Sequence, residues 1–425
     1  MSTARARRRL IPFLFVLFIV SYLDRINVGF AALQMNRALG FSATTYGLGA
    51  GIFFISYVLF EIPSNVILAR VGARIWIARI MMSWGVVSSA MMFVRSAPAF
   101  YALRFLLGAA EAGFFPGLIF YLTRWFPPRE RARTVAAFMT ATLAAGIVGG
   151  PVSGALLSVH AMGLDGWQWL FVVEGVPAIV LGVVVLAVLT ERPQDAAWLD
   201  ADERAALLAG VEGERPAARS AASPLAALRD GRTWLLAAVY FTIPVMLYGL
   251  GFWMPQMLKT ASNGSDFRAG LLSAIPYAVA AVAMVLVGRH SDRVGERRWH
   301  VAAAAAVAGA ALSLAPASGG LVWTVVTLSV AMAGLASMFG PFWALATTTA
   351  GGATGTAAAA SIALINSVGN IGGFVGPYLL GAIEDATHSF AAGLYAIAAL
   401  MAAGGALILA VHRDFPAVRR KDSLG

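Results

Sequence analysis

The stretch that decides the fold is GRHSDRVGERR, residues 288–298, eleven residues of glycine and charge in a 425-residue chain. The chain as a whole is 59% hydrophobic and only 12% charged. Soluble domains carry roughly a quarter of charged residues. The composition therefore predicts a membrane protein, and the charged stretch marks a connection between two apolar segments.

On both sides of this stretch, apolar segments long enough to cross a bilayer recur along the chain. A hydrocarbon core of about 30 Å takes roughly 20 apolar residues in a helix. Because lipid offers no partner to backbone polar groups, each span is expected to be α-helical. The predicted fold class is an all-α polytopic membrane protein. We expect twelve spans, at 10–33, 44–69, 75–94, 98–121, 132–158, 167–190, 233–258, 269–288, 299–317, 321–347, 356–383 and 389–411.

Arginine residues gather at alternate connections. They precede the first span and follow the second, fourth, eighth and twelfth, as at Arg8, Arg70, Arg131, Arg293 and Arg419. This alternation follows the positive-inside rule. It predicts a protein integral to the cytoplasmic (inner) membrane with both termini in the cytoplasm, and it accounts for the net charge of +10 without a nucleic-acid partner. The first span is too long and too polar for a cleaved signal peptide.

One long hydrophilic segment, 191–232, is rich in Ala, Pro and charge. Asp200 could cap a short helix that runs to about Val211. The segment divides the spans six and six. We therefore expect an N-terminal six-helix bundle at 1–190, a cytoplasmic linker at 191–232, and a C-terminal six-helix bundle at 233–425.

The two halves carry matching landmarks at nearly one offset. Gly72 and Gly295 stand 223 residues apart in the stretches NVILARVGARI and GRHSDRVGERR. Pro116 of FFPG and Pro341 of FGPF stand 225 apart, and the prolines of GIVGGPVSG and GGFVGPYLLG stand 226 apart. Three different pairs with one spacing indicate an internal duplication of six helices, the parallel repeat of a two-bundle transporter.

GRHSDRVGERR also resembles the signature G-x-x-x-D-R-x-G-x-R of the major facilitator superfamily, which joins helices 2 and 3 and recurs between helices 8 and 9. The second copy is complete and includes Asp292, Arg293 and Gly295. The resemblance implies a cytoplasmic turn whose carboxylate accepts from helix N-termini or arginines and latches one state. The first copy keeps Arg70 and Gly72 as gating residues, but Asn65 and Ala69 replace its first glycine and its aspartate, which puts that latch in doubt.

Within the superfamily, the chain is most similar to the anion:cation symporters of organic acids. The similarity lies in SYLDRINVGFAAL, IFFISYVLFEIPSNVI and RFLLGAAEAGFFPGLIFYLTRWFP. It implies import of an organic carboxylate, such as tartrate or a sugar acid, by proton symport and alternating access, with no cofactor. It also places Tyr57 as a donor to the substrate. Aromatic-carboxylate transport, uniport, anion exchange and Na⁺ coupling remain alternatives.

The residues alone lead to a similar hypothesis. Ionisable residues inside spans are costly and usually face a cavity or a partner. Those of the first half are Asp24, Arg25, Glu61, Arg104, Glu111 and Glu174, whereas the span interiors of the second half carry none. The second half offers neutral groups, namely Tyr240, Tyr248, Trp343, Asn366 and Asn370. We therefore expect the first half to handle charge and protons, and the second half to shape the pocket.

Four of these charged residues receive specific roles. Arg104 and Glu111 share a helix face but lie about 10.5 Å apart along the axis, too far to be simply each other's ion pair. Glu111 lies in the apolar stretch AAEAGFF, which disfavours the charged carboxylate and suits proton loading. Asp24 and Arg25 point about 100° apart. We assign Arg25 and Arg104 to the substrate carboxylate, and Asp24 and Glu111 to proton coupling, with Arg104 as the possible partner of Asp24.

The remaining polar residues have competing interpretations. Asn366 and Asn370 share one helix face and are assigned to substrate hydroxyls, although helix-to-helix hydrogen bonding is the alternative. Trp343 is assigned to the pocket, with simple packing as the alternative. Glu61 and Glu174 are interpreted as structural or gating residues.

Other classes of protein fit the sequence poorly. The chain has no cysteine, and its five histidines fall in predicted loops or at helix ends, so neither thiolate nor intramembrane histidine metal chemistry is expected. We expect no metal and no cofactor. A membrane-embedded enzyme lacks a catalytic constellation, and a sensor lacks room for a signalling domain. We expect a monomer in the lipid bilayer whose partners are a small carboxylate and protons.

Overall fold

The computed structural model describes residues 4–126, 128–212, 228–317, 320–350 and 356–411. In these ranges the chain is almost entirely helical, and the only β-pairing found there is an isolated bridge between Ala161 and Leu164. Among the described residues, ten helical segments are long and apolar enough to cross a membrane, with Ala97–Trp125 counted as one. Two shorter apolar segments, Thr140–Leu156 and Arg298–Leu314, complete the set. The predicted all-α fold with twelve spans is confirmed. The basic residues after the last span, including Arg419, lie outside the described ranges.

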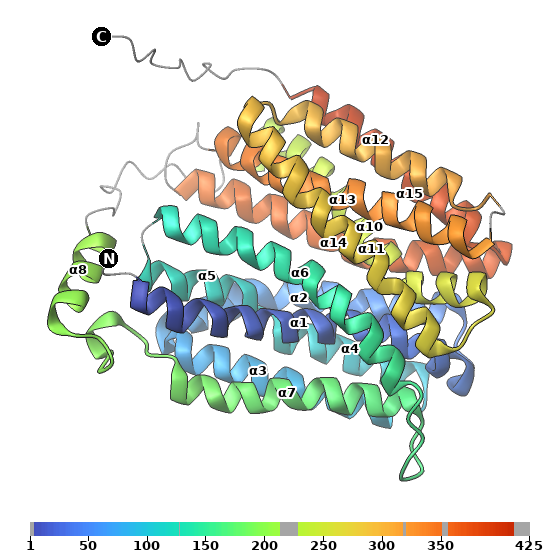
Figure 1. The fold of residues 1–425 in the computed structure, drawn as a ribbon, viewed down its shortest axis with the longest axis horizontal. Helices are drawn as coiled ribbons and strands as arrows, with labels where there is room; N and C mark the ends of the chain where they lie inside the picture. The colour runs from blue at the N-terminus through green and yellow to red at the C-terminus, as the bar shows by residue number, and fades with distance from the viewer. Residues whose placement is uncertain (1–3, 127, 213–227, 318–319, 351–355, 412–425) are drawn as a thin grey trace.

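The helices, drawn in Figure 1, have bounds close to those of the predicted spans. Those of the first half are α1 (Ala4–Leu39), α2 (Ala43–Val71), α3 (Ala73–Ala90), η1 (Met91–Phe93), α4 (Ala97–Glu111), α5 (Phe114–Trp125), α6 (Pro128–Leu156) and α7 (Gly166–Val188). Between the halves lie η2 (Pro193–Asp195) and α8 (Ala201–Glu212). Those of the second half are α10 (Gly231–Ser262), α11 (Asp266–Val294), α12 (Arg298–Leu314), α13 (Gly320–Ala350), α14 (Thr356–Thr387) and α15 (Phe390–Leu409).

Local signals in the sequence explain where several helices begin. Ser42, Ser96 and Ser265 each accept a hydrogen bond from a backbone N–H in the first turn of the helix that follows. The short linker helix α8 matches the expected one, because Asp200 accepts a hydrogen bond from the backbone N–H of Glu203 at 2.7 Å. The boundaries of the two bundles and the linker stay predictions.

The fourth span was expected to be one helix, and the structure corrects this. Helix α4 ends at Glu111, and α5 begins at Phe114. Gly113 has φ +86°, a left-handed conformation that glycine adopts without strain, and a Cβ there would lie 2.4 Å from the Oγ of Ser64. The break places the carboxyl group of Glu111 at the end of a helix, in the middle of the bundle.

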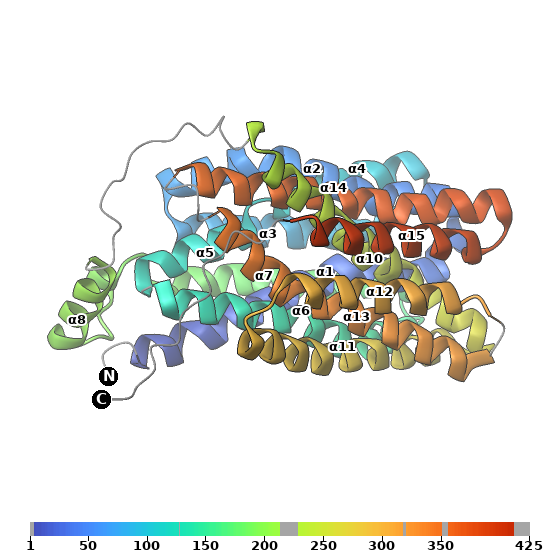
Figure 2. The same ribbon diagram turned by 90° about the horizontal axis from the view of Figure 1, so that it is seen from above.

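The helices of each half lie together, α1–α7 on one side and α10–α15 on the other (Figure 1). Figure 2 shows that the halves meet along two edges, where α2 lies beside α14 and α6 lies beside α11. We call the end of the bundle where α1 begins and α15 ends the terminal end, and the opposite end the distal end.

Backbones approach closely at the distal end. A Cβ on Gly270 of α11 would lie 2.3 Å from the carbonyl oxygen of Gly150 on α6, and one on Gly47 of α2 would lie 2.5 Å from that of Pro377 on α14. Small residues permit such contact between membrane helices. Asp385 of α14 also accepts hydrogen bonds from the first N–H groups of α2. The two halves are therefore closed against each other at this end.

The hydrogen bonds between the two halves are not spread evenly along the bundle. Hydrogen bonds between the two halves connect residues 25–46 of the first half with residues 248–266 or 381–385 of the second. All of these lie in the middle of the bundle or at its distal end. These hydrogen bonds thus join the halves from the Arg25 level to the distal end.

Candidate functional site

Arg25 of α1 lies where the two halves meet. It forms an ion pair with Glu111 of α4 and donates a hydrogen bond to the hydroxyl of Tyr248 on α10 at 3.3 Å. The centre of its guanidinium group lies 5.3 Å from the ring centroids of both Phe53 and Tyr57 on α2. A cation over aromatic faces is stabilised when water is excluded. Arg25 therefore links α1, α2 and α4 to the opposing half.

Glu111 is enclosed. Its side chain is 2% exposed, against 17% for that of Arg25, and Ser21 of α1 donates to the same carboxylate oxygen at 2.9 Å. A buried carboxylate is tolerated when it is paired and hydrogen-bonded. The prediction that Glu111 does not pair with Arg104 is confirmed, because its partner is Arg25.

Arg104 of α4 is completely buried and makes no ion pair among the described residues. Its Nε donates to the carbonyl oxygen of Gly49 at 3.3 Å, and one terminal nitrogen donates to that of Ala50 at 3.0 Å. Its Nη1 has no hydrogen-bond partner. Its guanidinium centre lies 5.1 Å from the ring of Phe53, the ring that Arg25 also covers. Arg104 thus keeps one donor unused beside the Arg25 group.

The expected pairing of Asp24 with Arg104 is not present, which is a correction. Asp24 is 2% exposed, and its Oδ1 accepts hydrogen bonds from the side chains of Asn27, at 3.0 Å, and Ser88 of α3. The physical reason is that neutral donors on α1 and α3 reach the carboxylate, while the donors of Arg104 turn to the α2 backbone. Sequence reasoning missed Ser21, Asn27 and Ser88.

Aromatic side chains surround the charged centre. Phe54 of α2 lies 4.3 Å from Tyr248 between ring centroids, across the two halves. Towards α13, Tyr240 stacks on Phe342 at 5.1 Å and meets Trp343 edge to face at 4.9 Å. Tyr57 and Trp343 thus lie in aromatic clusters on opposite halves.

Asn366 and Asn370 lie on α14 and are half-buried. Neither has a hydrogen bond to another described residue. Close approaches of α14 to α2 pair Gly373 with Phe54 and Phe374 with Gly51. The two helices run antiparallel, so each step back along α14 corresponds to a step forward along α2. Asn370 therefore lies level with Tyr57, and Asn366 lies level with Glu61. Both amides are therefore placed along the seam between the halves.

The complete signature copy forms a turn at the terminal end. Gly295 has φ +73° and its N–H closes α11 onto the carbonyl of Ser291. Asp292 is 70% exposed and pairs with Arg297 at 2.7 Å, within the same turn. Arg293 is exposed and makes no ion pair with another described residue. In this conformation the turn has no hydrogen bond to the first half among the described residues.

Glu296 of this turn caps α12. Its carboxylate accepts from the backbone N–H of Trp299 at 2.9 and 3.0 Å, and His300 lies 3.3 Å away. Partial burial alone would raise the pKa of Glu296, but hydrogen bonds from the Trp299 backbone, the His300 ring and the backbone N–H groups of His300 and Arg298 outweigh it and lower that pKa.

The degraded copy is completed from elsewhere in the chain. Gly72 has φ +102° and separates α2 from α3. Glu191, which follows α7, accepts from the first N–H groups of α3, at Ala73 and Arg74, and pairs with Arg124 of α5. Glu191 thus supplies a carboxylate to the turn that has Ala69 in place of an acid. Arg70 is exposed and makes no ion pair with a described residue.

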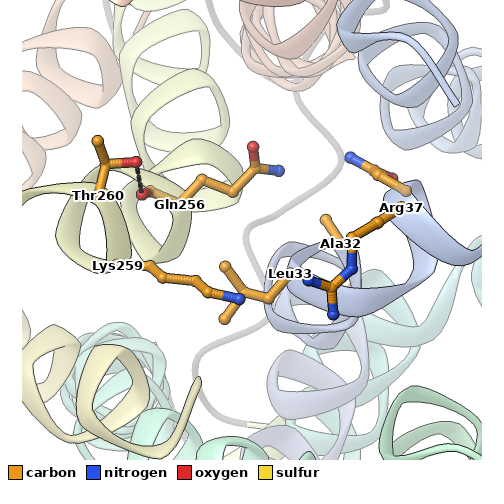
Figure 3. Close-up of a pocket in the computed structure, with 7 residues that line it drawn as sticks. Ala32, Leu33, Arg37, Gln256, Lys259 and Thr260 are labelled. Carbon is orange, nitrogen blue, oxygen red and sulfur yellow. Dashed lines mark hydrogen bonds between the residues drawn. The ribbon is translucent and has the colours of Figure 1, made fainter. Parts of the chain in front are cut away.

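A cavity of about 240 Å³ lies at the distal end between α1 and α10 (Figure 3). It is lined by Ala32, Leu33, Asn36, Arg37, Gln256, Lys259 and Thr260. None of the predicted site residues lines it. Two of the lining side chains, Arg37 and Lys259, are cationic, and Lys259 forms an ion pair with Asp266.

Comparisons with known proteins agree with this architecture. Residues 14–377 match the family model described as Major Facilitator Superfamily. A protein of Agrobacterium vitis named "Putative tartrate transporter" is 49% identical over 410 residues, which cover 96% of this chain and 94% of that protein. "Putative metabolite transport protein NicT" of Pseudomonas putida is 42% identical over 410 residues, with 95% and 92% covered. A bacterial homologue of the human lysosomal transporter Spinster, in an inward-facing and occupied conformation, superposes with a TM-score of 0.76 at 17% identity, with 96% and 97% covered.

Proposed function

This chain belongs to the major facilitator superfamily, and we propose from that premise that it imports a small organic carboxylate by proton symport and alternating access. Relatives named for tartrate transport support a hydroxylated acid such as tartrate or a sugar acid as the substrate. We place the chain in the inner membrane with both termini in the cytoplasm, so the terminal end faces the cytoplasm. All groups of the site come from one chain, so a monomer suffices.

The observation that carries the proposal is the ion pair of Arg25 with Glu111. A substrate carboxylate needs the same guanidinium donors that Glu111 occupies. If Glu111 takes up a proton, its attraction to Arg25 falls, and the substrate can replace it in a charge-assisted contact. Binding of the anion and binding of the proton then favour each other, which is the requirement for symport.

Arg104 offers a second contact. Its Nη1 is buried without a partner, and leaving a buried donor unsatisfied is unfavourable. Because both guanidinium groups cover the ring of Phe53, we propose that a dicarboxylate is held with one carboxylate on each arginine. This arrangement favours tartrate over a simple monocarboxylate.

The other assigned residues complete the pocket. Asn366 and Asn370 supply amide groups to the hydroxyls of the substrate, and Tyr57 donates its phenolic hydrogen. Trp343 closes the pocket from α13. Asp24 lies one residue from Arg25 and serves as a second proton-binding acid of the coupling machinery.

Alternating access requires the distal and terminal ends of the bundle to close in turn. The distal end is closed through the glycine contacts of α6 with α11 and of α2 with α14. We propose that the turns containing Asp292, Arg293 and Gly295, and Arg70 and Gly72, meet the opposite half when the terminal end closes instead. The two six-helix bundles, 1–190 and 233–425, then move about the site while the segment 191–232 connects them.

Aromatic carboxylates are the second candidate. The rings of Phe53, Phe54, Tyr57 and Tyr248 surround Arg25, and such faces stack on an aromatic acid. A ring-bearing substrate would use Arg25 alone and leave Arg104 with the α2 backbone.

A binding and transport panel separates these possibilities. Purified protein is tested by thermal shift against tartrate, a sugar acid, acetate, benzoate and an organic amine. It is then reconstituted in liposomes with an imposed pH gradient, a Na⁺ gradient, or anion on the opposite side. We expect stabilisation by hydroxylated acids and uptake driven by the pH gradient. Uptake driven only by Na⁺ or by exchange would contradict proton symport, and stabilisation only by the amine would contradict an anionic substrate.

A further inference from the structure

The cavity between α1 and α10 at the distal end has no part in the proposal above (Figure 3). Its volume is about 240 Å³, roughly eight times the ~30 Å³ that one water molecule occupies in the liquid. It is therefore large enough for a small organic acid. What it can bind depends on its position and on the charge and polar groups of its walls.

The cavity lies on the same seam between α1 and α10 as Arg25, about two turns farther towards the distal end. Arg25 donates to Tyr248 of α10. Four residues on in each helix, a Cβ on Gly29 would lie 3.0 Å from the carbonyl oxygen of Phe252. Four residues beyond Phe252, Gln256 lines the cavity. The cavity is therefore separated from Arg25 by one close contact between the two helices.

The walls of the cavity carry positive charge. Arg37 and Lys259 both line it, and none of the seven described residues that line it is acidic. Lys259 is paired with Asp266, which also accepts a hydrogen bond from Gln34 at 2.8 Å. Arg37 is exposed and makes no ion pair with another described residue. One positive charge at the cavity is therefore left without a counterion, which favours an anion as the ligand.

Two amide side chains add hydrogen-bonding groups to these walls. The Nε2 of Gln256 and the Oδ1 of Asn36 are enclosed and have no hydrogen-bond partner among the described residues. Each terminal amide can rotate about its last side-chain bond, which presents these atoms to the cavity. A ligand that satisfies both needs an acceptor for Gln256 and a donor for Asn36. A carboxylate and a hydroxyl of one molecule provide the two. Water also provides both, but it does not neutralise Arg37.

We propose that this cavity is a second binding site, which takes a small hydroxylated carboxylate before it reaches Arg25. Arg37 and the amide of Gln256 bind the carboxylate, and Asn36 accepts from a hydroxyl. In the proposed orientation the distal end faces outward, so the ligand enters while the contact of α1 with α10 closes the path inward. Because the walls belong to both halves, the site loses one wall when the distal end opens, and the ligand is then free to move to Arg25. The class of ligand rests on the proposed function.

The test counts the tartrate molecules that bind per chain at saturation, by equilibrium dialysis of the purified protein with labelled tartrate. We expect two in wild type and one in Arg37→Gln. Arg268→Gln is the matched control, because Arg268 is also an exposed arginine near the distal end but does not line the cavity. This control should still bind two.

A second measurement isolates the cavity from the site at Arg25. In the double variant Arg25→Ala, Arg104→Ala, one tartrate per chain should still bind. Adding Arg37→Gln should weaken that binding roughly ten- to a hundredfold, the effect of losing one charge-assisted contact. Succinate, the same diacid without hydroxyls, should bind the double variant less tightly than tartrate does. Asn36→Ala should remove this difference.

One tartrate per wild-type chain, or a count that Arg37→Gln leaves unchanged, would overturn the second site. Equal affinity of the double variant for tartrate and succinate would overturn the contact of Asn36 with a hydroxyl. If the double variant does not fold, the counts in wild type, Arg37→Gln and Arg268→Gln decide the matter alone. Failure of the second site would leave uptake driven by a pH gradient intact at saturating tartrate. Failure of the proposed function would abolish that uptake without changing the count in the double variant, so the two results are separable.

Discussion

Arg25 and Glu111 form an ion pair between α1 and α4 in which the arginine side chain is 17% exposed and the glutamate side chain is 2% exposed. Arg25 also contacts Tyr248 of the opposite half. The pair therefore connects the acid that is proposed to bind the proton with the seam where a substrate would enter. In this proposal, the protonation state of Glu111 determines whether the guanidinium group of Arg25 is free to bind the substrate.

Arg104 should distinguish dicarboxylates from monocarboxylates. In Arg104→Gln, we expect tartrate affinity to fall roughly ten- to a hundredfold, the effect of losing one charge-assisted contact of about 1.5–3 kcal/mol. Acetate affinity should change little. Isothermal titration calorimetry with both ligands measures the difference.

Arg25→Lys is the comparison for that experiment. A lysine keeps the charge but not the planar fork, so affinity for both ligands should fall. An equal loss of tartrate and acetate affinity in Arg104→Gln would contradict the two-arginine arrangement.

Gly270→Ala should open the distal end. The new Cβ would lie 2.3 Å from the carbonyl oxygen of Gly150, a backbone atom that cannot move cheaply. Overpacking of this kind costs about 1–3 kcal/mol, and here it acts only on the distal-closed state. We expect faster maleimide labelling of a single cysteine introduced at the distal end, which is practical because the chain has no cysteine. Gly288→Ala is the control, since nothing lies within 4 Å of its Cβ position, and its labelling should match wild type.

Asp292→Asn should act in the opposite sense. In this conformation Asp292 pairs only with Arg297 of its own turn. If it also contacts the other half when the terminal end is closed, its neutralisation removes a further interaction of about 1.5–3 kcal/mol from that state. Labelling at the terminal end should then rise and transport should slow, while substrate binding persists. Ala69→Asp, which restores an acid in the first copy, should shift labelling the other way if an arginine is within reach. Unchanged labelling in Asp292→Asn would mean that the turn only sets the orientation of the chain in the membrane.

Glu296→Gln should lower stability in a pH-dependent way. Because folding lowers the pKa of Glu296, its ionised carboxylate contributes to the free energy of unfolding at pH values above the usual carboxyl pKa of about 4.3. This contribution is lost as the pH falls through the lower pKa of the folded state. We expect a loss of about 1 kcal/mol at pH 7 as the α12 cap weakens, and a smaller loss as the pH falls towards the folded-state value. Thermal unfolding across this range measures it, with Asp195→Asn, an exposed acid outside that turn, as the control. A loss that does not depend on pH would contradict the assigned charge effect.

The sequence could predict the features that follow from composition and periodicity. Twelve apolar spans and the signature at Gly295 were sufficient for the fold, because a bilayer permits few structures. The separation of Glu111 from Arg104 followed from helix geometry alone. The break at Gly113 was missed, since an isolated glycine in an apolar helix is often tolerated and the contact with Ser64 is visible only in three dimensions.

Side-chain partners within the bundle were harder to predict. Charge complementarity suggested Arg104 for Asp24, but Ser88 and Asn27 provide the hydrogen bonds. Small polar residues are common in membrane helices and usually bond to their own backbone, so their sequence pattern contains no signal for a partner on another helix. Glu191 was missed for a related reason, because its partners at α3 and Arg124 are distant in the sequence.

The most direct test of the account is the pH dependence of tartrate affinity in wild type and Glu111→Gln, measured by calorimetry. If a proton on Glu111 frees Arg25, wild-type affinity should fall by about tenfold per pH unit once Glu111 ionises, as linkage of one proton requires. In Glu111→Gln, Arg25 has no competing carboxylate, so affinity should be high and independent of pH in this range. Equal pH dependence in the two proteins would contradict the exchange of Glu111 for the substrate on Arg25.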